Sequence, residues 1–229
     1  MSTRAIISYD GTENDRDALA LGRVFAQAGA EVSLAYVRHT QASEERREQL
    51  EDREAHALLQ GGAQALGTPD AARHVVVSGS TGDGLRSLAE REAADIVVFG
   101  SDYRTAPGAV RPGTSAQRLL DDGPAAVAIA PAAFREREPL RIATVGVLPD
   151  HNDDSARATG ESLAAALGAE VGVATGAGLL VVGSRPEAPH GRVMISAVAE
   201  YAIETASSPV LVVPRGVALQ FAVPSSTLA

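Results

Sequence analysis

The sequence predicts an α/β protein built on a doubly wound parallel sheet of Rossmann-like type, followed by a truncated copy of the same fold. Short apolar runs alternate with helix-length amphipathic segments along the first half of the chain. Strands that are connected through helices pair in parallel and are buried on both faces. Sequence fragments of the first half also recur in the second half, which indicates an internal repeat.

Composition narrows the classes of protein that fit. Of the 229 residues, 45% are hydrophobic but only 3% are aromatic, so the core is expected to consist of Ala, Val, Leu and Ile. The net charge of −9 opposes nonspecific binding to nucleic acids and anionic membranes, and neither is expected as a partner. The absence of cysteine excludes disulfides, thiolate catalysis and cysteine-bound zinc. Without a signal-peptide pattern or an apolar run of membrane length, we expect a cytoplasmic protein.

The first half is expected to hold five strands and four helices. A strand over 5–9 ends at Asp10 and Gly11, and apolar residues at helical spacing follow over 17–28. The later elements are a strand at 31–37, a charged helix at 43–66, a strand at 74–77, a helix at 85–93, a strand at 96–99, a helix at 116–120 and a strand at 127–130. Residues 79–84 lack the dinucleotide register G-x-G-x-x-G, and we interpret them as a loop before a helix capped by Thr81 or Asp83.

The second half is a shortened copy of the first. The tetrapeptide at 29–32 recurs at 168–171, an offset of 139, whereas Gly100 recurs as Gly183 at an offset of 83. The two offsets differ by 56 residues, which correspond to one strand and the helices on either side of it. Strands are expected at 142–148, 179–182 and 210–213.

Three segments of this half lack a clear helix or strand pattern. The charged residues 135–139 are interpreted as a linker between a first domain at 1–134 and a second at 139–216. Residues 171–175 are expected to be an edge strand of altered geometry or a loop, because so short a connection should not return the chain along a parallel strand. Residues 217–229 are expected to be a frayed tail.

The strongest chemical signal lies in residues 94–131, where a predicted strand, a glycine-rich loop, a helix and a strand follow one another. Gly100 opens the loop, and Gly113, Thr114 and Ser115 lead into the helix. Small and hydroxyl residues at this position accompany the unpaired amide groups of a helix start, which suit an anion such as phosphate. Simple helix capping is the alternative explanation. The loop also has a net positive charge, from Asp102, Arg104 and Arg111.

The order and spacing of these residues resemble the universal stress protein family, whose nucleotide loop has the pattern G-x2-G-x9-G-[ST]. Gly100, Gly113 and Thr114 match this pattern, whereas Tyr103 stands where the family has its middle glycine. The resemblance covers the first half and implies a sheet of order 3-2-1-4-5, with the ligand crevice at the carboxyl ends of the strands. It also implies ATP as the ligand, with Mg²⁺ left open as an accompanying ion.

The resemblance implies further site residues outside this loop. Asp10, next to Gly11, matches the family's aspartate that contacts the base or ribose, and Val37 matches the strand end that binds adenine through its main chain. Asp10 is equally explained as a turn residue, and Val37 as a buried strand residue. The counterparts of these residues in the second half are altered, so that half is not expected to bind nucleotide. Asp10, Tyr103, Gly113 and Thr114 correspond there to Pro149, Pro186, Ser196 and Ala197.

No catalytic or metal-binding set is evident in the sequence. The five histidines show no metal-ligand spacing, and neither a G-x-S-x-G elbow nor a G-x-x-x-x-G-K-[ST] loop occurs. We therefore expect a universal stress protein that binds adenine nucleotide in its first domain and regulates a stress response. The alternatives are a slow ATP-hydrolysing enzyme and a ligand-free interaction protein of the same fold.

The fifth strand of each half is expected to pair with the other inside one chain. Family members commonly dimerise through this strand, and residues 127–130 and 210–213 occupy the two corresponding places. Both would otherwise be exposed apolar edges, which favour aggregation. A pseudo-dimer within the chain follows from the resemblance, and a homodimer remains open.

Overall fold

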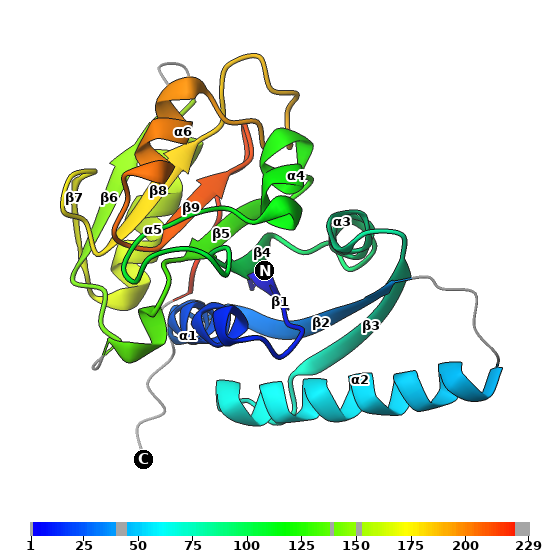
Figure 1. The fold of residues 1–229 in the computed structure, drawn as a ribbon. Coiled ribbons are helices and arrows are strands. Elements are labelled where there is room, and N and C mark those ends of the chain that lie inside the picture. The colour runs from blue at the N-terminus through cyan, green and yellow to red at the C-terminus, as the bar shows by residue number, and fades with distance from the viewer. Residues whose placement is uncertain (1, 40–44, 138–139, 150–152, 223–229) are drawn as a thin grey trace.

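The computed structural model describes residues 2–39, 45–137, 140–149 and 153–222 (Figure 1). Its strands are β1 (Arg4–Ser8), β2 (Glu31–His39), β3 (Ala72–Ser78), β4 (Ile96–Gly100), β5 (Ala126–Ala130), β6 (Thr144–Leu148), β7 (Glu170–Val173), β8 (Leu179–Gly183) and β9 (Val210–Val213). Its helices are α1 (Glu13–Gln27), α2 (Glu45–Leu66), α3 (Thr81–Arg91), α4 (Thr114–Asp122), α5 (Ser155–Leu167) and α6 (Ala197–Glu204), with a 3-10 turn η1 at Phe134–Glu136. The expected alternation of strands and helices is confirmed.

The described strands form one nine-stranded sheet in the order β3-β2-β1-β4-β5-β9-β8-β6-β7. The first half has the implied order 3-2-1-4-5, and the second half repeats it without a counterpart of β3. β5 and β9 pair antiparallel, with Ala128 opposite Leu211, while the other neighbours are parallel. The predicted pairing of the two fifth strands within one chain is therefore confirmed.

Helices cover both faces of the sheet (Figure 1). α1, α2 and α5 pack on one face, and α3, α4 and α6 pack on the other. Every residue of β5 is buried, and its sequence Ala-Val-Ala-Ile-Ala shows why the core needs few aromatic side chains. Among the described helices, none is long and apolar enough to cross a membrane.

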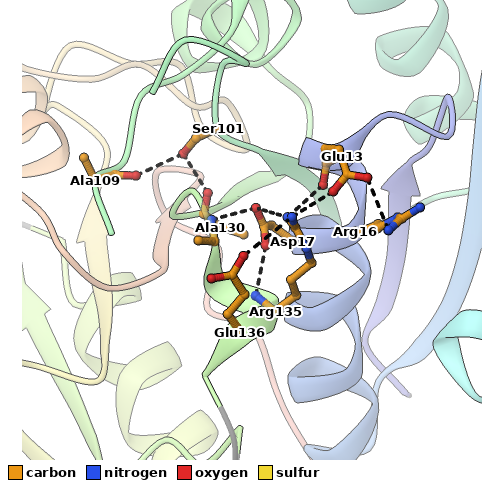
Figure 2. Close-up of polar contacts among 9 residues, drawn as sticks. Glu13, Arg16, Asp17, Ser101, Ala109, Ala130, Arg135 and Glu136 are labelled. Carbon is orange, nitrogen blue, oxygen red and sulfur yellow. Dashed lines mark hydrogen bonds and ion pairs between the residues drawn. The ribbon is translucent and has the colours of Figure 1, made fainter. Parts of the chain in front are cut away.

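The described part of the connection between the halves, up to residue 137, is packed, which corrects the interpretation of 135–139 as a linker over those residues. Phe134 is buried, and the carboxylate of Asp17, only 2% exposed, accepts the main-chain N–H groups of Ala133 and Arg135 at 2.9 Å. The Arg135 guanidinium also reaches Asp17 at 3.2 Å and Glu13 at 2.8 Å (Figure 2). A charged pattern was misread because the partners of these residues lie on α1, more than a hundred positions earlier. Residues 138 and 139 lie outside the described residues.

The segment after β9 is also packed as far as residue 222, although we expected a frayed tail. The N–H groups of Leu219 and Phe221 donate to the hydroxyls of Thr159 and Ser162 on α5, at 2.9 and 2.8 Å. The ring of Phe221 stacks on Phe25 of α1, with 6.1 Å between ring centroids. This segment therefore packs against both α1 and α5, and residues 223–229 lie outside the described residues.

β7 is a regular edge strand, parallel to β6, although we expected the short connection to prevent this. The connection from the end of β7 to the start of β8 can be short because β7 has only four residues. Along β6, the chain has to move back by only about two residues, or about 7 Å. The connection crosses directly over Gly146, where an added Cβ would lie 2.6 Å from the Cβ of Ala177. The lack of a side chain on Gly146 therefore allows this crossing.

The start of α3 corrects a further expectation. Ser80, rather than Thr81 or Asp83, is the N-cap, and its hydroxyl oxygen accepts the N–H of Asp83 at 3.2 Å. The Asp83 carboxylate in turn accepts the Ser80 hydroxyl at 2.7 Å, which holds the cap in place.

Candidate nucleotide site at the strand carboxyl ends

A cavity of about 300 Å³ lies at the carboxyl ends of β1 and β2. Ser8 and Ala35 form the last pairing between the two strands, so β2 continues beyond the end of β1. The cavity fills this step in the sheet and is bounded on one side by the start of α3. Its lining residues are Ser8, Tyr9, Asp10, Thr12, Ala35, Tyr36, Val37, His39 and Thr81.

Val37 presents its main chain beyond the end of β1. The N–H of Tyr9 donates to the carbonyl oxygen of Ala35 at 2.9 Å. Because alternate residues of a strand direct their main-chain groups to the same side, the N–H and C=O of Val37 also face the side on which β1 has ended. The Val37 side chain is buried near Gly84, where an added Cβ would lie 2.9 Å away. A strand valine and a main-chain ligand contact are compatible at this position.

Asp10 forms the turn between β1 and α1 and interacts with a second carboxyl group. Its Oδ1 accepts the N–H of Thr12 at 3.0 Å, and its own N–H donates to the carboxyl group of Asp15. Burial, together with the hydrogen bond to Asp10, raises the pKa of Asp15 to about 8. Burial also opposes ionisation of Asp10, but hydrogen bonds with Asp15 and Thr12 outweigh it and hold the pKa of Asp10 below its ordinary value. Within this pair, Asp10 is therefore the stronger acid and Asp15 the weaker one.

Two of the predicted site glycines have packing roles of their own. Gly11 has a φ of +85°, and an added Cβ would lie 2.6 Å from Cδ1 of Leu58 on α2. A Cβ on Gly100 would overlap the main-chain carbonyl of Asn14 in the first turn of α1. Glycine is therefore required at Gly11 by its positive φ and at Gly100 by the close approach of α1, whether or not a ligand binds.

Ser101 organises the loop between β4 and α4, although it was not among the predicted site residues. Its hydroxyl donates to the carbonyl oxygen of Ala130 at 2.7 Å and accepts the N–H of Arg111 at 3.2 Å. Figure 2 shows Ser101 between Ala130 at the end of β5 and Ala109 of its own loop. The recurrence of Gly-Ser at 183–184 was the available signal.

The matching loop of the second half repeats this frame. Ser184 donates to Val213 at 2.7 Å and accepts the N–H of Met194 at 3.3 Å, each partner lying 83 positions after its counterpart. One more main-chain bond is duplicated, from Asp102 to Arg111 and from Arg185 to Met194, at 2.8 Å in both loops. The repeat seen in the sequence is therefore a repeat in three dimensions.

Comparison with known proteins identifies the fold and the family. The model of the universal stress protein family matches residues 1–131, which is more than half of the chain. The chain belongs to the universal stress protein family.

Solved structures match both halves of this universal stress protein. A universal stress protein from Archaeoglobus fulgidus DSM 4304 is 15% identical over 94% of this chain and 100% of that chain, with a TM-score of 0.63. A functionally unknown protein from Pseudomonas aeruginosa PAO1 is 14% identical over 93% of each chain, with a TM-score of 0.59. At such identities these matches show the fold alone, over the first half and its copy together. No curated protein matches the chain.

The helices that follow the two loops of this universal stress protein begin differently. Gly113 is the N-cap of α4 and offers no side-chain cap, and an added Cβ there would meet no atom within 4 Å. Thr114 is exposed and Ser115 half-buried in the first turn of α4. At the start of α6, by contrast, the Ser196 hydroxyl oxygen accepts the N–H of Ala199 at 3.2 Å. The second helix caps itself, while the first turn of α4 has no such internal cap.

Tyr103, at the family's middle glycine, lies at the surface of the loop. Its side chain is 70% exposed, and the Arg104 guanidinium lies 4.9 Å from its ring centroid. The N–H of Arg104 donates to the carboxylate of Asp102 at 3.0 Å, which fixes the turn that carries this pair. The tyrosine ring therefore does not fill the interior of the loop.

The structure brings some of the predicted site residues together and adds one. Asp10 and Val37 line the same cavity, and Thr81 joins them, with its hydroxyl 3.3 Å from Nε2 of His39. Beside Thr81, a Cβ on Gly82 would lie 3.5 Å from the carbonyl oxygen of Ser115, so the starts of α3 and α4 are neighbours. Thr81 escaped prediction because its contact to β2 is tertiary. No group of three metal-ligating side chains occurs in the part of the chain that the structure describes.

Proposed function

We propose that this universal stress protein binds an adenine nucleotide, ATP, in its first half and acts as a regulator in a stress response. The observation that carries the proposal is the cavity at the step between β1 and β2, with the Asp10 carboxylate and the Val37 main chain on its walls. A carboxylate accepts hydrogen bonds from ribose hydroxyls, and a main-chain N–H and C=O complement the edge of adenine. Ligand crevices of doubly wound sheets lie at such strand ends.

The start of α4 supports a place for the phosphates. The amide groups of a helix start and the helix dipole favour negative charge, and Gly113 leaves them without a side-chain cap. Thr114 would add a hydroxyl donor, with Ser115 beside it, and Arg104 and Arg111 supply positive charge to the loop. Magnesium, if present, would rely mainly on the phosphate oxygens, because the described residues contain no cluster of three acidic or histidine ligands.

Calorimetric titration with ATP tests the proposal. We expect one site per chain, and Thr114→Ala should weaken binding about ten- to a hundredfold, since a hydrogen bond to a charged group contributes about 1.5–3 kcal/mol. Ala197→Thr, which places the same hydroxyl at the matching position of α6, is the control and should create no second site. Two equivalent sites in the wild type, or an unchanged affinity in Thr114→Ala, would contradict the assignment.

A second candidate is a ligand-free interaction protein, which is favoured by the exposed pair of Tyr103 and Arg104 on the loop. The same titration separates the two, because this candidate takes up no adenine nucleotide. Release of phosphate from bound ATP would instead support a slow ATP-hydrolysing enzyme. We place the regulatory role in the cytoplasm on the family resemblance alone.

A further inference from the structure

In the first half, α3 lies beside α4 (Figure 1). Polar contacts join the two helices. The guanidinium of Arg118 on α4 pairs with Asp83 at 2.8 Å, and Asp122 pairs with Arg86 at 3.3 Å. The absence of a side chain on Gly82 allows the Arg118 stem to pack against the first turn of α3. The side of α4 that meets α3 therefore consists of Ser115, Arg118 and Asp122.

In the part of the second half that the structure describes, no helix corresponds to α3 beside α6. Between β7 and β8, where that helix would occur, the chain has only the short crossing at 174–178. The offset of 83 places Val198, Tyr201 and Thr205 at the positions of Ser115, Arg118 and Asp122. Val198 is 66% exposed and Tyr201 is 68% exposed. The side of the helix that lost its cover has thus become more apolar, the opposite of what solvent exposure favours.

Two cavities lie along this side of α6, with volumes of about 520 and 540 Å³. They share Leu148 and Val198 and together form what we call the α6 groove. One end is lined by the strand ends of β6 and β8, and the other by the crossing at 174–177 and residues 205–208. Among the residues that the structure describes, neither lining contains a charged side chain. The groove is therefore an uncharged surface in a protein whose net charge is −9.

We propose that the α6 groove binds an amphipathic helix of another protein, in the place that α3 occupies beside α4. The replacement of Arg118 and Asp122 by Tyr201 and Thr205 removes the charges that recognise α3, so the partner must offer apolar side chains to the groove. α3 supplies the template, because an 11-residue helix fills the equivalent position in the first half. Docking of an apolar helix face into such a groove is a common mode of recognition.

Charge determines what flanks the apolar face of the partner. Glu200 and Glu204 are exposed on α6, on either side of Tyr201 in the sequence. A partner helix with lysine or arginine beside its apolar face would complement them. A second copy of this chain would instead bring its own Glu200 and Glu204 to the interface, and like charges oppose that association. The occupant is therefore a basic amphipathic helix rather than another copy.

Fluorescence anisotropy with the full chain tests this proposal. The probe is a labelled synthetic 18-residue peptide of leucine and lysine with its leucines on one helical face, and a peptide of the same composition with scattered leucines is the control. We expect the patterned peptide to bind at least tenfold more tightly than the scattered one. Val198→Ser with Tyr201→Gln, which leaves the charge unchanged, should weaken its binding at least tenfold.

A matched variant controls for the loss of any exposed valine. Val77 on the edge strand β3 is 53% exposed and lies outside the groove, so Val77→Ser should leave binding unchanged. We expect the variants to remain folded because all three side chains are at the surface. Circular dichroism checks this. Absence of binding by the patterned peptide, equal binding of both peptides, or wild-type affinity in the double variant would each overturn the proposal. A wild-type dimer that the double variant abolishes in sedimentation velocity would also overturn it, in favour of a second copy.

Discussion

The loops that lead into α4 and α6 share one internal frame but present different surfaces. Ser101 and Ser184 make the same two hydrogen bonds, at matching distances, 83 positions apart. At the helix starts the loops diverge, because Gly113 gives α4 no side-chain cap and Ser196 caps α6. The comparison shows that the bonds which fold this loop and the residues which could hold a ligand are separate sets. The second set can change while the first is retained.

The largest effect should come from removing the second half of the chain. Deletion of residues 139–229 would expose β5, whose residues are all buried against β4 and β9 in the intact chain. An exposed apolar edge strand pairs readily with other chains, so the remaining fragment should self-associate or precipitate. Light scattering coupled to size exclusion measures this, and a soluble monomer at high concentration would show that β9 is not needed to protect the edge.

Two alanine substitutions distinguish a glycine that is needed for packing from a glycine that could face a ligand in the first loop. Gly100→Ala should destabilise the fold by about 1–3 kcal/mol, because its Cβ would overlap the main chain of Asn14. Gly113→Ala has open space around the new Cβ and a φ of −75°, so its stability should stay within about 0.5 kcal/mol of the wild type. Urea denaturation of both variants measures the difference. Equal stabilities would mean that α1 can move away from β4 at little cost.

The carboxyl pair of Asp10 and Asp15 should make the stability of the first half depend on pH. The pKa of Asp15 is raised from its ordinary 3.8 to about 8, so the folded state binds a proton that the unfolded state has released. Its contribution to stability is full below pH 4 and is lost as the pH rises toward 8. Asp15→Asn should therefore flatten the fall in thermal stability over this range. The exposed Asp154, its counterpart at an offset of 139, is the control, and Asp154→Asn should leave the wild-type slope unchanged.

The smallest expected effect concerns the tyrosine at the family's middle glycine. Tyr103→Gly removes an exposed ring and restores the family pattern, so ATP should bind several-fold more tightly, on the order of 1 kcal/mol. Pro186→Gly, at the matching position of the second loop, should leave ATP affinity unchanged. Titration calorimetry of both variants measures this. Weaker binding in Tyr103→Gly would instead show that the ring contacts the nucleotide, for example by stacking on the base.

The selection of Asp10 and Val37 as site residues came from the family resemblance rather than from a local pattern. Parallel strands bring their carboxyl ends to one edge of the sheet, which explains why the two residues line one cavity. Thr81 could not be anticipated, because its contact to His39 joins elements that are separated by α2 and β3. The raised pKa of Asp15 was equally hidden, since it requires both burial and a nearby carboxyl group.

By itself, the sequence determined the order of strands and helices in the first half, the shortened repeat and the placement of β9 at 210–213. Apolar periodicity and repeated fragments report on short stretches of chain, and burial in parallel strands imposes them directly. Tertiary structure alone decided that Arg135 packs on Asp17, that Phe221 stacks on Phe25, and that Gly146 lets the chain cross over β6. Each of these contacts depends on which surfaces meet after folding. The local sequence around a polar residue, a glycine or a residue near the chain end does not predict which distant residue it will contact.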